Sequence, residues 1–330
     1  MSKRDVVVLG AARSAIGTFG GSLAEIEPAE LAGQVMKAAV QRSGVDPKAI
    51  NYVTVGNVIP TESRFAYVAR VASIQAGLPM DSVAMALNRL CSSGLQAIVT
   101  TSQNILLGDC DYGIGGGVEV MSRGAYHSPQ LRSGARMGDV KMIDSMVATL
   151  TDPFGVGHMG VTAENLAVKW GITREEQDAL AVESHRRAAA AIAEGRFKSQ
   201  IVPVVQKTRK GEVTFDTDEH VKASTTMETL AKLKPAFKKE GGTVTAGNAS
   251  GINDGAAALI VASAEAAKKY GLTPIARILG VATAGVAPRI MGIGPAPATQ
   301  KLCARLGLKP TDFDVIELNE AFASQGIAVL

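Results

Sequence analysis

The sequence predicts a layered α/β fold with a mostly parallel sheet and two related halves. Three observations lead to this prediction. Strand and helix patterns alternate over the first third of the chain, residues from about 122 to 251 are more polar and charged, and a helix–glycine–proline–strand pattern occurs twice. Alternating strands and helices are typical of a sheet with helices packed on its faces. At 330 residues the chain is long enough for two or more domains.

The first third holds short apolar runs separated by helical patterns. The predicted strands cover residues 6–9, 52–55, 83–87 and 111–120, and the predicted helices cover 31–42, 68–76 and 92–107. The run at 83–87 is apolar throughout and is expected to be a buried strand. Gly108 is expected to end the third helix.

The middle of the chain changes character. A long helix is predicted from residue 174 to residue 194, and Thr173 with Glu176 forms the Thr-x-x-Glu pattern of a capping box at its start. The paired basic residues of this region are expected on a solvated face. A buried strand at 256–262 and a helix at 264–270 then follow.

An internal echo indicates a duplicated half. The helix at 31–42 precedes Gly44, Pro47 and the strand at 52–55, and a helical pattern at 299–306 precedes Gly307, Pro310 and a predicted strand at 315–318. The offset is constant, since 307 minus 44 gives 263. Residues 276–280 also resemble residues 6–10 loosely, which makes duplication a better interpretation than chance punctuation.

Cys91 is the candidate nucleophile. It lies between the strand at 83–87 and the helix at 92–107, within the segment Asn-Arg-Leu-Cys-Ser-Ser-Gly. A cysteine at such a turn is close to unpaired backbone N–H groups and to the positive end of the helix dipole. Both favour the thiolate, which is the nucleophilic form. The alternative is an inert core thiol, and position alone leaves the two open.

Composition and charge exclude several classes of protein. The net charge of +3 and the aromatic content of 4% are too low to indicate a nucleic-acid-binding surface, although they suit a small anionic ligand. The three cysteines form neither a metal pattern nor a disulfide framework, so a reducing, cytoplasmic location is expected. No signal-peptide core and no apolar run of about 20 residues is present, so no membrane association is expected.

Six segments form an ordered set of motifs along the chain. They are residues 13–21, 88–94, 115–122, 158–160, 247–255 and 319–323, and they include Gly-Asn-Ala-Ser-Gly and Asn-Glu-Ala-Phe. This set closely resembles the thiolases, in particular the bacterial acetyl-CoA acetyltransferase and short-chain β-ketothiolase branch. The resemblance covers essentially the whole sequence.

The resemblance implies a five-layered αβαβα fold with two duplicated halves and an inserted loop domain. The expected domains are an N-terminal half at 1–121 and 252–274, a CoA-binding loop domain at 122–251, and a C-terminal half at 275–330. The implied chemistry is reversible Claisen condensation of acyl-CoA with acetyl-CoA, or thiolytic cleavage of 3-ketoacyl-CoA. Both pass through an acyl-thioester on Cys91, which divides one difficult step into two easier ones.

The resemblance also implies residue roles. Asn319 matches an asparagine that holds a water in one oxyanion hole, although a helix N-cap is the alternative for an asparagine at this place. The backbone N–H of Cys91 matches a donor of the other hole. His158 and Ser250 match residues that contact pantetheine. Lys222 stands where relatives usually have an arginine near the adenine and phosphates, and lysine lacks the planar fork of arginine.

Six further positions match the lining of the same substrate tunnel, with ordinary core packing as the alternative: Leu150, Met159, Phe237, Ala246, Met291 and Phe322. The resemblance implies no metal and no cofactor, since CoA is a substrate, and it implies a homotetramer. Residues 131–142 are either an interface loop or a solvated loop. Acyl-chain preference and physiological direction, in fatty acid metabolism or polyhydroxyalkanoate precursor synthesis, stay open.

Two motifs of the family are absent from the sequence. The family has a histidine in Gly-His-Pro, which takes the proton of the nucleophile, and a second cysteine in Cys-x-Gly-Gly-Gly. Neither occurs here, and Cys110 and Cys303 are expected to be structural. The counterpart of the Cys91 turn would fall near 354 (91 plus 263), so the second half is expected to be truncated and the turnover low.

Two other functions fit part of this pattern. Ketoacyl-ACP synthases share the fold and a nucleophilic cysteine, but they lack the His-Met-Gly and Gly-Asn-Ala-Ser-Gly segments found here. The other alternative is a non-catalytic short form that binds acyl-CoA or a partner subunit.

Overall fold

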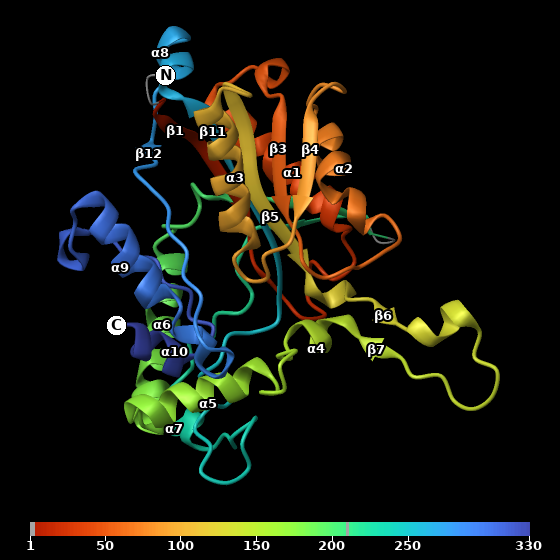
Figure 1. Cartoon of the computed structure of the whole chain (residues 1–330), viewed down its shortest axis with the longest axis vertical. Coiled ribbons are helices and arrows are strands. Elements are labelled where there is room, and N and C mark those ends of the chain that lie inside the picture. The colour runs from red at the N-terminus through yellow and green to blue at the C-terminus, as the bar shows by residue number, and fades with distance from the viewer. Residues whose placement is uncertain (1–3, 209–210) are drawn as a thin grey trace. The chain divides into compact units, whose positions relative to one another are not determined.

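A computed structural model describes residues 4–208 and 211–330, which form two compact units (Figure 1). The first three residues of the N-terminal segment therefore lie outside it. Unit 1 contains the described residues of 4–146, 197–220 and 252–278, and unit 2 contains those of 147–196, 221–251 and 279–330. The predicted domain boundaries differ from this division into units and stay a prediction.

The described part of unit 1 contains a mixed β-sheet with helices on both faces and two separate two-stranded sheets. Its strands are β1 (Val6–Ser14), β2 (Gly17–Thr18), β3 (Tyr52–Gly56), β4 (Val83–Leu87), β5 (Tyr112–Val120), β6 (Tyr126–His127), β7 (Ile143–Asp144), β8 (Ile201–Val202), β9 (Val204–Thr208), β10 (Gly211–Phe215), β11 (Asn253–Ser263) and β12 (Ala276–Arg277). Its helices are α1 (Pro28–Ser43), α2 (Val68–Gln75), α3 (Ser93–Leu107) and α8 (Ala264–Lys269), and α4 (Ser145–Thr149) crosses the boundary of the units.

The order of the main sheet is β12-β1-β11-β5-β3-β4, with β2 paired to β11 and β8 paired to β1. The prediction of a mostly parallel sheet was wrong. Although β3 is parallel to both β4 and β5, β11 is antiparallel to β1 and to β5. The reason is that β11 enters the sheet after a long excursion of the chain and runs between two strands of the first third.

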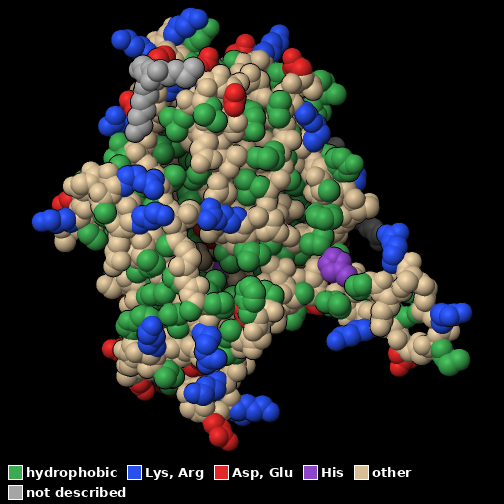
Figure 2. All heavy atoms as spheres, in the orientation of Figure 1, with side chains coloured by type: hydrophobic (Ala, Val, Ile, Leu, Met, Phe, Trp, Pro, Cys, Tyr) green, Lys and Arg blue, Asp and Glu red, His purple; other side chains and the backbone are tan. Residues whose placement is uncertain are grey.

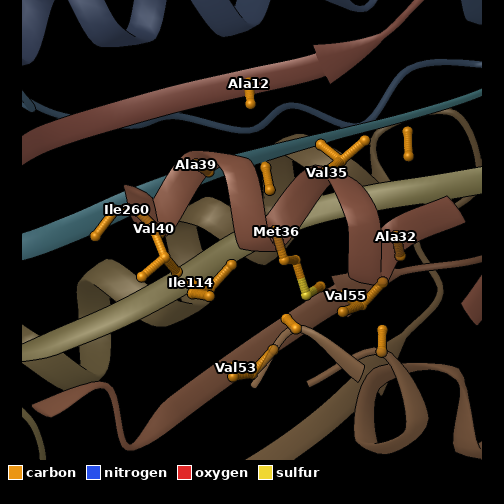
Figure 3. Packing of buried hydrophobic residues seen from close by; sticks show 14 of the residues in the cluster. Ala12, Ala32, Val35, Met36, Ala39, Val40, Val53, Val55, Ile114 and Ile260 are labelled. Carbon is orange, nitrogen blue, oxygen red and sulfur yellow. The ribbon is translucent and has the colours of Figure 1, made fainter. Parts of the chain in front are cut away.

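The core of unit 1 follows from strand alternation. Helix α1 packs on one face of the sheet and α3 packs on the other. Figure 3 shows Val35, Met36 and Val40 of α1 against Val53 of β3 and Ile114 of β5, all of them buried. Successive residues of a strand point to opposite faces, so a strand covered on both sides is apolar throughout.

Residues 83–87 were predicted to form a buried strand. They do form a strand, β4, but the predicted burial was wrong. Strand β4 is the edge of the sheet, it pairs with β3 alone, and its residues are half-buried or exposed, with Val83 at 53%. An apolar run predicts a strand, but it does not say whether that strand lies inside the sheet or at its edge.

Unit 2 consists of helices and loops in its described part. Its main helices are α5 (Met159–Trp170), α6 (Arg174–Ala193), α7 (Met227–Ala231), α9 (Pro295–Leu306) and α10 (Ala323–Val329). The predicted capping box of α6 is confirmed, because Thr173 and Glu176 each bond to the backbone N–H of the other. Within the described residues, no helix is long and apolar enough to cross a membrane.

The predicted strand at 315–318 was wrong. These residues pair with no described strand, and Val315 and Ile316 are 78% and 59% exposed. Backbone N–H and C=O groups form a strand only where a neighbouring strand supplies partners. The preceding helix and turn formed as predicted, at α9 and at the 3₁₀ helix Pro310–Asp312.

Candidate active site

The turn that carries Cys91 is held in a strained conformation. Among the described residues, Leu90 is the one non-glycine residue with a positive φ, at 50°. Leucine rarely adopts this left-handed conformation, so neighbouring groups must hold it in place. The side-chain Oδ1 of Asn88 accepts the Leu90 N–H at 2.9 Å. We call residues 88–93 the Cys91 elbow.

Ser93 fixes the other side of the elbow. Its Oγ accepts the N–H of Arg89 at 2.8 Å and donates to the carbonyl of Leu90 at 2.6 Å. Because Ser93 is also the first residue of α3, these bonds join the elbow to the N-terminus of the helix. Cys91 therefore lies two residues before a helix start, and it is exposed.

Small residues let α3 lie close to the sheet beneath Cys91. A Cβ at Gly56 would stand 2.5 Å from the carbonyl carbon of Ser93, and a Cβ at Gly115 would stand 2.6 Å from the Cα of Ile98. Both distances are below any normal contact, so only glycine fits at these positions. The glycines of β5 and Gly56 thus determine how closely α3 approaches the sheet, and the elbow lies at the N-terminus of this helix.

The two other cysteines differ from Cys91. Cys110 is buried, and burial together with the charges of Asp109 and Asp111 raises the pKa of its thiol to about 11. Cys303 is buried on α9. The structural roles predicted for both are consistent with these positions. The alternative of an inert core thiol does not apply to Cys91, because its side chain faces solvent in unit 1.

Unit 2 brings several of the predicted binding residues together. The His158 ring stacks on Phe237 at 4.7 Å between centroids, and Phe237 meets Phe322 edge-on at 6.1 Å. The N–H of Met159 donates to the Leu150 carbonyl at 2.8 Å. The N–H of Ser250 donates to the carbonyl of Ala321 at 3.0 Å, which brings the 247–251 and 319–323 motifs side by side.

His158 has a structural task within this cluster. Its Nδ1 accepts the N–H of Gly160 at 3.1 Å, so it is the N-cap of α5. Burial lowers the pKa of His158, which favours the neutral ring that this bond requires. Its Nε2 stays available for a ligand, since the described residues supply no partner for that atom.

A buried polar set anchors the Gly-Asn-Ala-Ser-Gly loop. Asn248 donates through Nδ2 to Asp178 at 2.9 Å and accepts the Thr245 N–H at 2.8 Å, and Asp178 pairs with Arg174 at 2.7 Å. Buried polar groups whose bonds are all satisfied hold a loop in one conformation. Ser250 lies at the exposed end of this loop.

Asn319 is exposed, and its side chain is not a helix cap. The N-cap of α10 is Phe322, three residues further on, so the structural alternative for Asn319 was wrong. Residues 317–320 line an open depression in the surface of unit 2. The amide of Asn319 is therefore accessible to a small molecule.

The remaining predicted residues lie in separate parts of unit 2. Ala246 and Lys222 are exposed, and the Lys222 N–H donates to His185 Nδ1 at 3.3 Å. Met291 is 42% exposed and belongs to the 3₁₀ helix Pro288–Ile293, which packs on α5. Among the described residues, no group of three His, Cys, Asp or Glu side chains is arranged to hold a metal ion.

Sequence reasoning missed the residues that support the site. Asn88, Leu90 and Ser93 shape the elbow, and Gly160 accommodates Phe237, whose ring a Cβ at Gly160 would approach to 2.2 Å. Glu119, a half-buried carboxylate of β5, was also missed. All of them lie in or beside the recognised motifs, which was the available signal, but only the structure gives their bonds.

Comparisons with known proteins agree with this site. The family model "Thiolase, N-terminal domain" matches residues 6–265, and "Thiolase, C-terminal domain" matches residues 272–330. The Beta-ketothiolase BktB of Cupriavidus necator is 55% identical over 326 residues, covering 99% of this chain and 83% of the relative. The Acetyl-CoA acetyltransferase of the same organism is 48% identical over 327 residues, covering 98% and 83%.

Solved structures give the same result. The crystal structure of the Bacillus anthracis acetyl-CoA acetyltransferase has a TM-score of 0.96 at 47% identity, covering 99% of this chain and 82% of that chain. Human mitochondrial 3-ketoacyl-CoA thiolase in complex with CoA has a TM-score of 0.94 at 42% identity, covering 99% and 82%.

These similarities confirm the predicted thiolase fold. The matches run through 98 to 100% of this chain, and the chain spans about 83% of the length of the curated relatives, so the expected truncation stays a prediction. With both family domains matched and relatives at 55% and 48% identity, the chain belongs to the thiolase family, whose members are acyltransferases.

Proposed function

We propose that Cys91 accepts the acyl group in a thiolase reaction between two CoA thioesters. Its thiolate attacks the thioester carbonyl, the carbon–sulfur bond to CoA breaks, and CoA leaves as a thiolate that takes up a proton. A second acyl-CoA then loses a proton from its α-carbon to solvent, and that carbon attacks the acyl thioester. The bond between the acyl group and the Cys91 sulfur breaks, 3-ketoacyl-CoA leaves and the Cys91 thiolate is restored; the reverse reaction cleaves that product. The observation that carries the proposal is the exposed Cys91 on a strained elbow at the start of α3.

Each half-reaction develops negative charge on a carbonyl oxygen, which needs preplaced donors. The backbone N–H of Cys91 would supply one donor, assisted by the N-terminus of α3. Asn319 would hold a water at the other position, and its exposed amide supports this role. These are roles implied by the family and matched to positions of this chain.

Binding of the CoA thioester would fall to unit 2. His158 and Ser250 would contact pantetheine, and Lys222 would lie near the adenine and phosphates. The hydrophobic positions Leu150, Met159, Phe237, Ala246, Met291 and Phe322 would line the tunnel. The stacked His158 and Phe237 rings and the bond between Ser250 and Ala321 support a preformed surface of this kind.

Turnover is proposed to be slow in a polypeptide with the printed sequence. No Gly-His-Pro or Cys-x-Gly-Gly-Gly segment occurs in its 330 residues. Without the family's histidine, Cys91 would have only the activation that its position provides, and losing one member of a catalytic unit typically lowers kcat by several orders of magnitude. Acyl transfer onto Cys91 would then be observable, whereas complete condensation would be slow.

The test is incubation with acetyl-CoA, followed by intact-mass measurement and peptide mapping. We expect one acetyl group on Cys91, none on Cys110 or Cys303, and none in Cys91→Ala. Hydroxylamine should remove the adduct, because it cleaves a thioester. Binding of acetyl-CoA without any adduct would overturn the proposal and favour the non-catalytic alternative, an acyl-CoA-binding or subunit-interaction short form.

Assembly and location are further parts of the proposal. We infer a cytoplasmic homotetramer that uses CoA as substrate, with no cofactor and no metal. The segment 131–142 supports the assembly, because Leu131, Met137 and Met142 are 59%, 97% and 54% exposed. In Figure 2, the part of the surface formed by this segment bears apolar as well as basic side chains. Met137→Glu should dissociate the tetramer in light scattering, and an unchanged mass would exclude this interface.

A further inference from the structure

A half-buried carboxylate, that of Glu119, binds the loop that follows β3. Glu119 of β5 accepts the backbone N–H groups of Val58 at 3.0 Å and Ile59 at 2.9 Å, and its Oε1 also accepts Asn57 Nδ2 at 3.1 Å. Within the described part of the chain, no Lys or Arg forms a salt bridge with it. Burial raises the pKa of Glu119 to about 7, although the two backbone bonds partly oppose this shift. Removing a carboxylate from water without a cation costs free energy, and here the three hydrogen bonds from the loop offset part of that cost.

The loop held by Glu119 touches the residues just before Cys91. The N–H of Asn57 donates to the carbonyl of Leu87 at 3.1 Å, and Asn88 Nδ2 donates to the carbonyl of Val58 at 3.5 Å. Asn88 uses its other side-chain atom, Oδ1, to hold the N–H of Leu90. A continuous set of hydrogen bonds therefore runs from Glu119 through the 57–59 loop to the strained residue of the elbow.

We propose that Glu119 is a positioning residue for Cys91, acting through the 57–59 loop and Asn88 on the left-handed conformation of Leu90. The inference rests on the proposed function of Cys91 as the acyl acceptor. Glu119 bonds to no residue of the elbow itself. Its three donors all come from one loop, and that loop is bonded to the segment that enters the elbow, so a displaced carboxylate would release the Asn88 contact.

The variant Glu119→Gln isolates this effect. One side-chain oxygen of Glu119 accepts Ile59 N–H and Asn57 Nδ2, and the other accepts Val58 N–H. Whichever way the glutamine amide turns, its NH₂ faces a donor, so at least one bond is lost while the volume is kept.

Asp254 provides a matched control on the neighbouring strand. It lies on β11 opposite Val120, and burial raises its pKa as well. Its carboxylate accepts the N–H and the Oγ–H of Ser122, at 3.0 and 2.6 Å, and not the 57–59 loop. Asp254→Asn therefore perturbs a buried carboxylate of the same sheet without touching the elbow.

The experiment measures three quantities on the full chain. They are the rate of Cys91 acetylation by acetyl-CoA, the rate of Cys91 alkylation by iodoacetamide, and hydrogen exchange of the peptide amides at 88–93. Because small misplacements of a reacting atom are expensive, we expect Glu119→Gln to slow acetylation by about tenfold while alkylation changes by less than about twofold. Exchange at the Arg89 and Leu90 amides should become faster, and Asp254→Asn should match the wild type in all three.

Cys110 and Cys303 report general loosening, since both are buried. If Glu119→Gln matches the wild type in acetylation and exchange, or if it exposes these two thiols to alkylation as well, the inference is overturned. If the wild type itself is not acetylated, the proposed function fails while the exchange measurement still decides the inference. If Glu119→Gln does not fold, Asn57→Ala removes the loop's side-chain donor instead, and unchanged acetylation and exchange there overturn the inference.

Discussion

Two regions of the molecule share one sequence pattern and end in different structures. In the first copy, α1 leads through Gly44 and the 3₁₀ helix Pro47–Ala49 into β3, which pairs with β4 on one side and β5 on the other. In the second copy, α9 leads through Gly307 and the 3₁₀ helix Pro310–Asp312 into residues 315–318, which form no strand.

The difference separates local from long-range causes. Gly44 and Gly307 have the same φ of 69°, and each helix ends at its glycine. Helix, left-handed cap and proline turn are therefore set by residues close together in sequence. The strand needs partners from elsewhere, and Val53 is fully buried while its counterpart Ile316 is 59% exposed (316 minus 53 gives 263).

The largest expected contrast is between these two strand positions. Val53→Asp should lower the stability of unit 1 by about 4 kcal/mol, because it buries an unpaired charge. Ile316→Asp should change stability by less than about 0.5 kcal/mol, because the side chain stays in water. Urea-dependent labelling of Cys110 reports unit 1, and labelling of Cys303 reports unit 2. Equal effects of the two variants would mean that residues 315–318 are packed in solution.

The next contrast concerns pH. Glu119 lies on β5, which pairs with β3 of the first copy. Burial raises its pKa from 4.5 to about 7, so between these pH values the folded chain holds a proton on Glu119 that the unfolded chain releases. Unit 1 should therefore lose stability as pH rises from about 4.5 to about 7, by at most about 3 kcal/mol. Glu119→Gln should abolish this slope.

The measurement is the urea midpoint of Cys110 labelling at pH 5 and pH 8, in the wild type and in Glu119→Gln. Residues 321–323 of the second copy are held by backbone bonds to Asn248 and Ser250, which do not titrate. The Cys303 midpoint should thus be independent of this substitution. A wild-type slope that persists in Glu119→Gln would assign the pH dependence to other groups.

The residues that follow the two patterns give a smaller contrast. With the constant offset of 263 residues, Asn319 in the second copy corresponds to Gly56 in the first copy (319 minus 56 gives 263). Gly56→Ala should cost about 2 kcal/mol, because its Cβ would press on the start of α3 at Ser93. It should also slow acetylation of Cys91. Asn319→Ala should leave stability within about 0.5 kcal/mol of the wild type, and a large loss of stability there would show that this side chain is packed.

The smallest expected effect is the one that both copies share. Gly44→Ala and Gly307→Ala should each cost about 1 kcal/mol, because alanine resists a positive φ. An added Cβ would meet no steric clash at either position. At Gly44 it would lie 3.5 Å from Leu272, an ordinary contact, and at Gly307 it would have no neighbour within 4 Å. Thermal unfolding followed by Cys110 and Cys303 labelling compares the two. A cost confined to one copy would contradict a purely local cap.

Motifs in the sequence predicted most of the candidate site. The segment around Cys91 predicted the nucleophile, and that role stays a prediction. The 158–160 segment predicted residues that unit 2 does bring together, as the stacking of His158 on Phe237 shows. The support of the elbow by Ser93 and Asn88 was not predictable. Those bonds depend on side-chain directions that a motif does not encode.

The sequence by itself determined the helices, their glycine ends, the capping box of Thr173 and the thiolase motifs, because these depend on residues a few positions apart. Only the tertiary structure decided that β11 runs antiparallel between β1 and β5, that β4 is an edge, and that residues 315–318 stay unpaired. The physical reason is that a helix satisfies its own backbone hydrogen bonds, whereas a strand depends on partners that can lie anywhere in the chain.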